Sequence, residues 1–480
     1  MPAIFRAQEV VLATRGRLLQ GRGEESFLGI STDSRSCQTG ELFIPLRGEK
    51  YDGHHFIPKA LIRGVRGVLV EKGKVPGETG SWLFNPGGAA AFPPEVTVVE
   101  VPDTLTALGD LARAWRRRFS LPVVCLTGSC GKTTVKEMTA RVLGRVFRVL
   151  KNELNLNNLI GLPWTLLRLD SSHEAAVLEM GMNRFGEIRR LTEISEPTVG
   201  VLLNVHPAHT EGVGGMEGVA LAKGELVQAL SPEATLIYNA DDPQVSRRAA
   251  SFPGRCISFG FGPGAEVRGK DRRPQGPQGQ ALQVEWRKVS WTLPLAVPGE
   301  HQALNALAAT AVGLALGVPP EETVQALRDF VAIHRRSQIQ RLPGGINLFN
   351  DCYNANPGSM AVALKTLLEL KGSGRAAAAL GDMLELGTLA AEAHRELGRQ
   401  AARVGLDFLV IYGNHRFEVA QGAEEVGFPA SQLYPVASRE EGARLLKDWL
   451  RPGDWLLVKG SRSMHMEGLI KFLEEGEKGG

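Results

Sequence analysis

Short apolar runs alternate with amphipathic stretches along most of the chain, a pattern typical of an α/β protein. In the middle of the chain, four apolar runs have the length of buried strands, and helix-like segments separate them as in a parallel sheet. Three further runs repeat this arrangement towards the C-terminus. The first group covers residues 121–126, 175–178, 199–204 and 235–239, and the second covers residues 376–380, 408–412 and 455–458.

The chain is too long for a single core, because 480 residues correspond to about three domains. We predict a small α/β domain over residues 1–102 and a central domain with a parallel sheet over residues 103–320. A Rossmann-like, doubly wound domain is predicted over residues 321–480. Within these domains, the Gly/Pro-rich stretch 72–94 is predicted to be a loop, and the polar segment 262–280 a surface hairpin.

Composition excludes several other classes of protein. A hydrophobic fraction of 43% and a charged fraction of 22% are those of a soluble globular protein. The net charge of +3 is small for this length and argues against nucleic-acid binding. The five cysteines are scattered without metal-binding spacing, which favours reduced thiols in a cytoplasmic protein. No apolar run approaches the length of a membrane span, so we expect no membrane insertion.

A glycine-rich string between a strand-like run and a helix-like stretch is the strongest chemical signal in the chain. Backbone N–H groups of such a loop bind phosphate, the lysine neutralises its charge, and a hydroxyl holds Mg²⁺. The loop is shorter than the usual phosphate-binding loop (P-loop), because Leu126 stands where the first glycine is expected. The residues concerned are Gly128, Ser129, Cys130, Gly131, Lys132, Thr133 and Thr134.

Polar residues also follow other strand-like runs of the central domain, and each has a structural and a functional interpretation. Glu179 ends an apolar run, where ligands bind in open α/β sheets, and its carboxylate suits Mg²⁺. Its structural alternative is a solvated side chain. Asn157 and Asn158 belong either to a plain polar loop or to an amide contact with phosphate.

Three residues further along the central domain are ambiguous in the same way. His209 either caps its loop or binds metal or phosphate. Lys223, taken alone, is predicted to be a solvated surface lysine. Asn305 lies one helical turn after His301, so the two share a helix face and Asn305 faces either the core or a nucleotide.

Three polar clusters follow strand-like runs in the third domain, at residues 350–360, 381–387 and 459–463. Polar residues are common in loops, so each cluster alone means little. Because the carboxyl ends of parallel strands meet at one edge of a sheet, three such clusters in one domain predict a binding site along that edge.

Taken in order, these strings resemble the Mur ligase family, the ATP-dependent amide-bond-forming enzymes of peptidoglycan synthesis, over nearly the whole chain. The family's P-loop has the same short form. The strings 155–163, 222–225, 351–360 and 381–387 are most similar to those of the members that join D-alanyl-D-alanine to UDP-N-acetylmuramoyl-tripeptide. Two N-terminal strings, at residues 31–35 and 46–54, are similar to the family's UDP-sugar domain.

The resemblance implies a role for each candidate position around ATP. Lys132 and its loop would hold the phosphates, and Thr133 and Glu179 would bind one Mg²⁺. His209 and a carbamylated Lys223 would help to bind a second Mg²⁺. Asn158, or its neighbour Asn157, would touch the γ-phosphate or the acyl group. The residues implied for adenosine are Asn305, Arg336 and Asp351.

The resemblance also implies the other substrates and the reaction. The carboxylate of UDP-N-acetylmuramoyl-tripeptide would be activated by ATP as an acyl phosphate and joined to D-alanyl-D-alanine by a monomeric enzyme. The alternatives are another Mur-family amide ligase, either the one that adds the third residue or folylpolyglutamate synthase, and a non-catalytic ATP-binding module. The UDP-sugar contacts implied are Ser31, Asp33, Ser34, Arg35, Asp52 and His54, and the dipeptide contacts are Asn354, Asn356 and Arg462.

Overall fold

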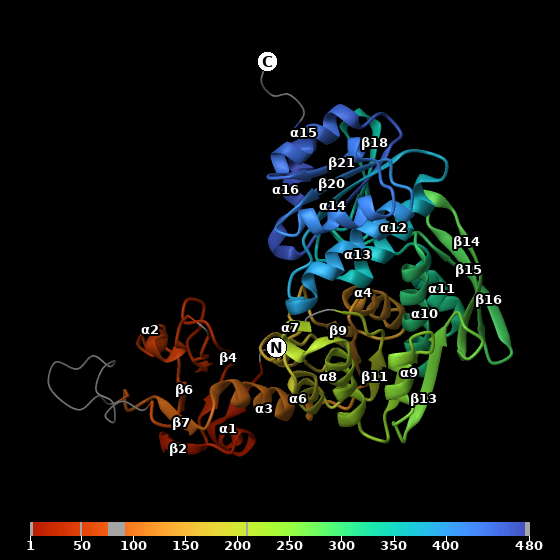
Figure 1. Cartoon of the computed structure of the whole chain (residues 1–480). Coiled ribbons are helices and arrows are strands. Elements are labelled where there is room, and N and C mark those ends of the chain that lie inside the picture. Colours follow the sequence, from red (N-terminus) through yellow and green to blue (C-terminus); the bar gives the residue numbers. More distant parts are fainter. Residues whose placement is uncertain (1–2, 49, 75–91, 208–209, 476–480) are drawn as a thin grey trace. The chain divides into compact units, whose positions relative to one another are not determined.

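The computed structural model describes residues 3–48, 50–74, 92–207 and 210–475. The chain divides into two compact units. The first comprises Met1–Cys125, Arg148–Gly181 and Arg189–Pro197, and the second comprises Leu126–Phe147, Met182–Ile188 and Thr198–Gly480. Within the described residues the strands form four sheets, and helices connect most of them (Figure 1). Most of the predicted loop 72–94 lies outside the described residues.

The N-terminal part is built on a five-stranded sheet of order β2-β7-β6-β5-β4. Strand β6 is buried along its whole length, and Val68 and Val70 share an apolar cluster with Ile57 and Ala60 of α2. Strand β5 covers only Leu42–Phe43 of the apolar run at residues 42–46, in which Pro45 has no N–H for a ladder. The elements are β1 (Phe5–Arg6), α1 (Ala7–Thr14), β2 (Arg17–Gln20), β3 (Ser26–Phe27), β4 (Ile30–Ser31), β5 (Leu42–Phe43), α2 (Ile57–Ile62), β6 (Gly67–Glu71) and β7 (Thr97–Val101).

The middle of the chain contributes a nine-stranded sheet of order β16-β15-β14-β13-β12-β11-β8-β10-β9. The predicted hairpin is confirmed, since β14 pairs antiparallel with β15, and β16 extends this ribbon (green in Figure 1). Its strands are β8 (Val123–Thr127), β9 (Val149–Lys151), β10 (Ala175–Glu179), β11 (Val199–Leu202), β12 (Thr235–Asn239), β13 (Arg255–Gly260), β14 (Val267–Pro274), β15 (Gln280–Trp286) and β16 (Val289–Leu295).

Helices link these strands and place the polar strand ends. Helix α3 begins where Asp103 accepts the N–H of Thr106, which satisfies a backbone donor of its first turn. The helices are α3 (Thr104–Arg116), α4 (Lys132–Leu143), α5 (Gly161–Leu166), α6 (Glu187–Ser195), α7 (Thr210–Val213), α8 (Gly215–Ala229), α9 (Pro243–Ala249), α10 (Glu300–Ala315) and α11 (Pro320–Arg328).

The C-terminal part is a six-stranded sheet of order β17-β18-β22-β19-β20-β21, in which β17 alone is antiparallel to its neighbour within the described residues. The elements are β17 (Gln338–Leu342), β18 (Ile346–Asn350), α12 (Pro357–Lys371), β19 (Ala376–Gly381), α13 (Ala390–Arg403), β20 (Phe408–Tyr412), α14 (Arg416–Glu425), β21 (Leu433–Val436), α15 (Arg439–Trp449), β22 (Trp455–Lys459) and α16 (Glu467–Glu474).

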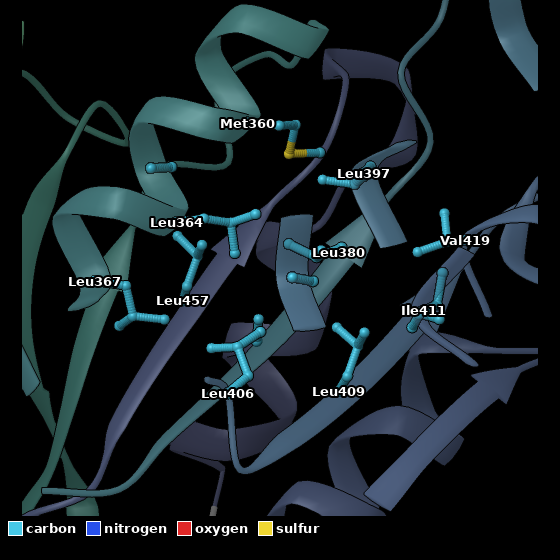
Figure 2. Close-up of a cluster of buried hydrophobic side chains, with 14 of the residues drawn as sticks. Met360, Leu364, Leu367, Leu380, Leu397, Leu406, Leu409, Ile411, Val419 and Leu457 are labelled. Atoms are coloured by element: carbon cyan, nitrogen blue, oxygen red, sulfur yellow. The ribbon is translucent and has the colours of Figure 1, made fainter. Parts of the chain in front are cut away.

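Successive side chains of a strand point to opposite faces of the sheet. In this C-terminal sheet, both sets of side chains are buried. Leu380 of β19 points into a cluster with Met360 and Leu364 of α12 (Figure 2). Its neighbour Ala379 belongs to a second cluster, which contains residues of α15 and α16. Helices on both faces of a mostly parallel sheet are the doubly wound arrangement predicted for this part.

Candidate active site

The P-loop joins β8 to α4 in a conformation that depends on two glycines. Gly131 has a φ of +79°, and a Cβ there would come within 2.6 Å of Asn305 Oδ1. A Cβ on Gly128 would come within 2.8 Å of the Leu203 Cβ. Lys132 begins α4 and donates to the Gly128 carbonyl at 2.8 Å. The loop therefore brings a lysine ammonium and a helix N-terminus together, an arrangement suited to an anion.

Residues that follow β11 hold the P-loop in place. The Cys130 N–H donates to Asn204 Oδ1 at 2.8 Å, and Asn204 Nδ2 donates back to the Cys130 carbonyl at 3.1 Å. The Ser129 hydroxyl donates to the His206 carbonyl and accepts the His206 N–H, both at 2.9 Å. Asn204 was not among the predicted site residues, although the signal was present: it opens the polar string that follows the β11 run.

Glu179 lies at the end of β10, and its side chain is only 3% exposed. Asn157 Nδ2 donates to Glu179 Oε1 at 2.8 Å. Asn158 is used differently, because its Oδ1 accepts the N–H groups of Ile160 and Gly161 where α5 begins. Of the two asparagines, Asn157 therefore faces the carboxylate and Asn158 shapes the turn.

The position of Lys223 in the structure shows that the interpretation from its local sequence was wrong. It is not a solvated surface lysine: it lies on α8 and is only 2% exposed. Burial lowers the pKa of Lys223 well below its ordinary value, and the positive charge of Lys132 lowers it further. Lys223 is therefore within electrostatic reach of the P-loop. The predicted ligand His209 lies outside the described residues.

The predicted adenosine residues lie on α10 and next to β17 and β18. Asn305 is 9% exposed and lies against Gly131, as the glycine geometry above shows. The Arg336 guanidinium lies 3.8 Å from the centre of the Tyr353 ring, a cation–π distance. Asp351 Oδ1 accepts the Ser337 N–H at 2.8 Å. The carboxylate of Asp351 also pairs with Lys459, which was not among the predicted site residues.

The predicted dipeptide residues lie in the loop before α12. Asn356 Oδ1 accepts the Ser359 N–H at 2.9 Å and so caps α12. The same oxygen accepts the Cys130 thiol at 3.2 Å, which joins this loop to the P-loop. Asn354 Oδ1 accepts the Arg462 N–H at 3.3 Å, and the half-exposed Arg462 guanidinium donates to Glu467. The structure thus pairs Cys130 with Asn356 and Arg462 with Asn354, and both asparagines belong to the loop before α12.

Two pairs of predicted residues interact within the N-terminal unit. Asp33 binds the Arg35 guanidinium and backbone N–H, and these bonds lower the pKa of Asp33 to about 2. His54 Nδ1 lies 2.7 Å from Asp52 Oδ1, and His54 Nε2 accepts the Glu71 N–H at 3.2 Å. Both ring nitrogens of the buried His54 are thus engaged inside the unit. Ser31 and Ser34, which flank Asp33 in the sequence, are both buried.

Two kinds of site are absent from the residues that the structure describes. No group of three or more His, Cys, Asp or Glu side chains in these ranges could hold a metal ion. No helix in the same ranges is long and apolar enough to cross a membrane.

Family models match most of the chain. The model described as Mur ligase middle domain matches residues 126–313, that described as Mur ligase, glutamate ligase domain matches residues 335–462, and that described as Mur ligase family, catalytic domain matches residues 26–116. The chain belongs to the Mur ligase family, as the resemblance predicted.

Individual relatives are similar over almost their full length. The chain is 34% identical to the UDP-N-acetylmuramoyl-tripeptide–D-alanyl-D-alanine ligase of Bacillus subtilis, over 96% of either chain. A crystal structure of MurF from Acinetobacter baumannii has a TM-score of 0.87, with 31% identity and 99% of each chain covered. MurF ligase from Thermotoga maritima in complex with ADP has a TM-score of 0.80, with 26% identity and 93% and 97% coverage. These similarities confirm the three-domain α/β fold; the boundaries at 102/103 and 320/321 stay predictions.

Proposed function

We propose that this chain is an ATP-dependent ligase that joins D-alanyl-D-alanine to UDP-N-acetylmuramoyl-tripeptide. The observation that carries the proposal is the similarity to ligases of that name over 96% of the chain. A second support is the geometry of the P-loop, in which Lys132 bonds to the Gly128 carbonyl and Asn204 bonds to the Cys130 backbone. Membership of the Mur ligase family indicates an ATP-dependent amide ligase. The proposal concerns which substrates this ligase joins.

In this proposal the P-loop, residues 128–134, and above all Lys132 bind the ATP phosphates. Asn305, Arg336 and Asp351 contact the adenosine. The burial of Asn305 against Gly131 and the turned-in carboxylate of Asp351 support these roles, because both side chains are already oriented. A pre-oriented site loses less conformational entropy when its ligand binds.

The donor chemistry fits Mg²⁺, which prefers oxygen ligands and is often bound through substrate phosphates. Thr133 and Glu179 would hold one ion; His209 and a carbamylated Lys223 would hold a second. Carbamylation needs a neutral amine, and burial, which lowers the pKa of Lys223, favours that form. The carbamate also replaces a cation by an oxygen ligand. When bound, Mg²⁺ would offset the negative charge that develops on the phosphoryl oxygens.

The reaction follows from the weakness of a carboxylate as an acylating agent. The terminal carboxylate of the tripeptide attacks the γ-phosphorus of ATP, and ADP leaves. The dipeptide amine then attacks the acyl phosphate, the amide forms, and phosphate leaves. Lys132 stabilises the charge on the transferred group throughout, and Asn158 or Asn157 orients the γ-phosphate or acyl group. The acyl phosphate hydrolyses in water, so the bound site must exclude water.

The domains divide the substrates. Residues 1–102 bind the UDP-sugar through Ser31, Asp33, Ser34, Arg35, Asp52 and His54, and residues 103–320 bind ATP. Residues 321–480 bind the dipeptide near Asn354, Asn356 and Arg462, and they also bind part of ATP through Arg336 and Asp351. Because His54 is buried and bonded to Asp52, we propose that it orients Asp52 in the UDP-sugar site. Dependence on ATP and a UDP-linked precursor fits a cytoplasmic enzyme, and we propose that it acts as a monomer.

The experiment that tests the proposal is release of phosphate from ATP and Mg²⁺. We expect release with UDP-N-acetylmuramoyl-tripeptide and D-alanyl-D-alanine together, and background release with either alone. Lys132→Ala serves as the inactive control. A diamino acid with the UDP-linked dipeptide precursor, or glutamate with folate, in place of the substrate pair tests the other amide ligases of the family. Release with one of those amines instead of D-alanyl-D-alanine would overturn the proposal.

A further inference from the structure

Lys459 is a buried lysine that none of the roles above uses. It ends β22, its side chain is 2% exposed, and its ammonium pairs with the Asp351 carboxylate. The same ammonium donates to the Asn354 carbonyl at 3.0 Å and lies 3.4 Å from the Asp351 carbonyl. A buried ammonium is costly unless oxygen atoms surround it, so these contacts determine where it sits.

The parallel pairing of β18 and β22 explains why Lys459 meets this loop. Asn350 is opposite Val458 in the register, and the Asp351 N–H donates to the Val458 carbonyl at 3.1 Å. Lys459 and Asp351 are the next residues of the two strands, so they emerge side by side at the carboxyl edge of the sheet. The lysine therefore holds residues 351–354 from the neighbouring strand.

The two residues that Lys459 binds carry different proposed roles. Asp351 is proposed to contact adenosine, and Asn354 belongs to the loop proposed to contact the dipeptide. Asp351 Oδ1 accepts the Ser337 N–H, while its other oxygen pairs with Lys459. With one partner on each oxygen, the carboxylate has a set orientation. A single ammonium thus orients a nucleotide-side carboxylate and a backbone carbonyl of the dipeptide loop.

We propose that Lys459 is a positioning residue that aligns the nucleotide and dipeptide contacts of the ligase reaction. This inference rests on the proposed function. Hydrogen bonds from an ammonium are stronger than neutral ones, so loss of the charge should release Asp351 and the Asn354 carbonyl together. Methionine has a similar length and no donor, which makes Lys459→Met the most direct variant.

The test is steady-state phosphate release by the full chain carrying Lys459→Met. We expect the KM for ATP and the KM for D-alanyl-D-alanine each to rise about tenfold or more, the loss typical of a charged hydrogen bond. The KM for the UDP-tripeptide should stay within about twofold of the wild type, because its proposed contacts lie in residues 1–102. Unchanged KM values for ATP and dipeptide would overturn the inference.

Two further variants separate positioning from folding. Lys371→Met is the matched control, since Lys371 lies in the same C-terminal sheet domain and also donates to a backbone carbonyl, that of Gly405; it should leave all KM values unchanged. The double variant Asp351→Asn with Lys459→Met removes both charges of the pair. We expect Lys459→Met alone to lower the melting temperature, and the double variant to recover it while its KM for the dipeptide stays high. A dipeptide KM that recovers with stability would show a purely structural role.

The inference and the proposed function fail in different ways. If the wild type releases no phosphate with D-alanyl-D-alanine, the proposed function fails. Binding of Mg-ADP, measured by calorimetry, then tests Lys459 directly: Lys459→Met should weaken binding about tenfold and Lys371→Met should not. Equal ADP affinities in the wild type and in Lys459→Met would overturn the positioning role.

Discussion

At the scale of single residues, Lys223 gives the most specific prediction. Its amine is buried and has a lowered pKa, so it is neutral more readily than a surface lysine and is able to react with carbon dioxide. We expect the wild type, supplied with ¹³C-bicarbonate, to show a carbamate signal by NMR and to lose activity in bicarbonate-free buffer. Added bicarbonate should restore that activity.

Two lysine variants make this test selective. Lys223→Arg should lack the carbamate signal and should not respond to bicarbonate, because arginine keeps its proton. Lys270→Arg changes a lysine of the β14 strand that pairs with Glu285, and it should keep both the signal and the response. A wild type that is fully active without bicarbonate and shows no signal would remove the carbamate from the mechanism.

Single residues also show where inference from sequence stops. The places of the P-loop between β8 and α4 and of Glu179 at the end of β10 were predictable, because both follow from the local sequence pattern. The burial of Lys223 and the contacts of Lys459 were not predictable from local pattern. Lys223 has small, mixed neighbours in sequence, and Lys459 meets Asp351 from 108 residues away. Such contacts depend on which strands pair, and the local sequence does not contain that information.

At the scale of elements, the start of α10 gives a prediction about pH. His301 Nε2 lies 3.2 Å from the Ser337 hydroxyl, and Nδ1 lies 3.5 Å from that of Thr366. Burial lowers the pKa of His301 from 6.5 to about 4. Nearby charged groups have smaller effects, some of which raise this pKa and some of which lower it. Between these values the unfolded chain binds a proton that the folded chain does not, so stability falls as the pH drops from 6.5 towards 4. The groups concerned are Asp351 and Glu369, which raise the pKa, and Lys459 and Arg272, which lower it.

We therefore expect His301→Gln to flatten the dependence of the unfolding free energy on pH in this window. The difference in slope should reach at most about 1.4 kcal/mol per pH unit, the effect of one proton. Urea unfolding at several pH values between 4.5 and 7 measures it. His465→Gln, at a histidine whose side chain is 63% exposed, is the control and should leave the slope as it is. Identical slopes for wild type and His301→Gln would contradict the prediction.

Element positions were easier to predict than their contacts. The runs at 235–239 and 408–412 became β12 and β20 with the same limits, because buried strands of a parallel sheet are mostly apolar. The short strands β2 and β21 carry no such run and were missed. In β2, for instance, the residues are exposed or half-buried, so polar side chains are tolerated.

At the scale of the whole molecule, the proposed division of three substrates over three domains would require those domains to meet for catalysis. Within the second compact unit, an ion pair joins β14 to α12, the helix that follows the loop proposed to contact the dipeptide. Arg272 Nη1 and Nη2 donate to the two oxygens of Glu369 at 3.0 and 2.5 Å, and their side chains are 14% and 19% exposed. A two-bond pair of this kind fixes direction as well as distance.

We expect charge reversal at either end to reduce turnover, because Arg272→Glu and Glu369→Arg each place like charges together. The double swap should restore much of the loss, with a coupling energy of about 1–3 kcal/mol, as for residues in direct contact. Turnover and urea unfolding of all four proteins measure it, and strictly additive effects would show that the pair is not formed. The comparison of the two readouts also locates its action. Coupling in turnover with none in unfolding means that the pair acts when β14 and α12 come together for catalysis, whereas coupling in both means that it already stabilises the resting chain.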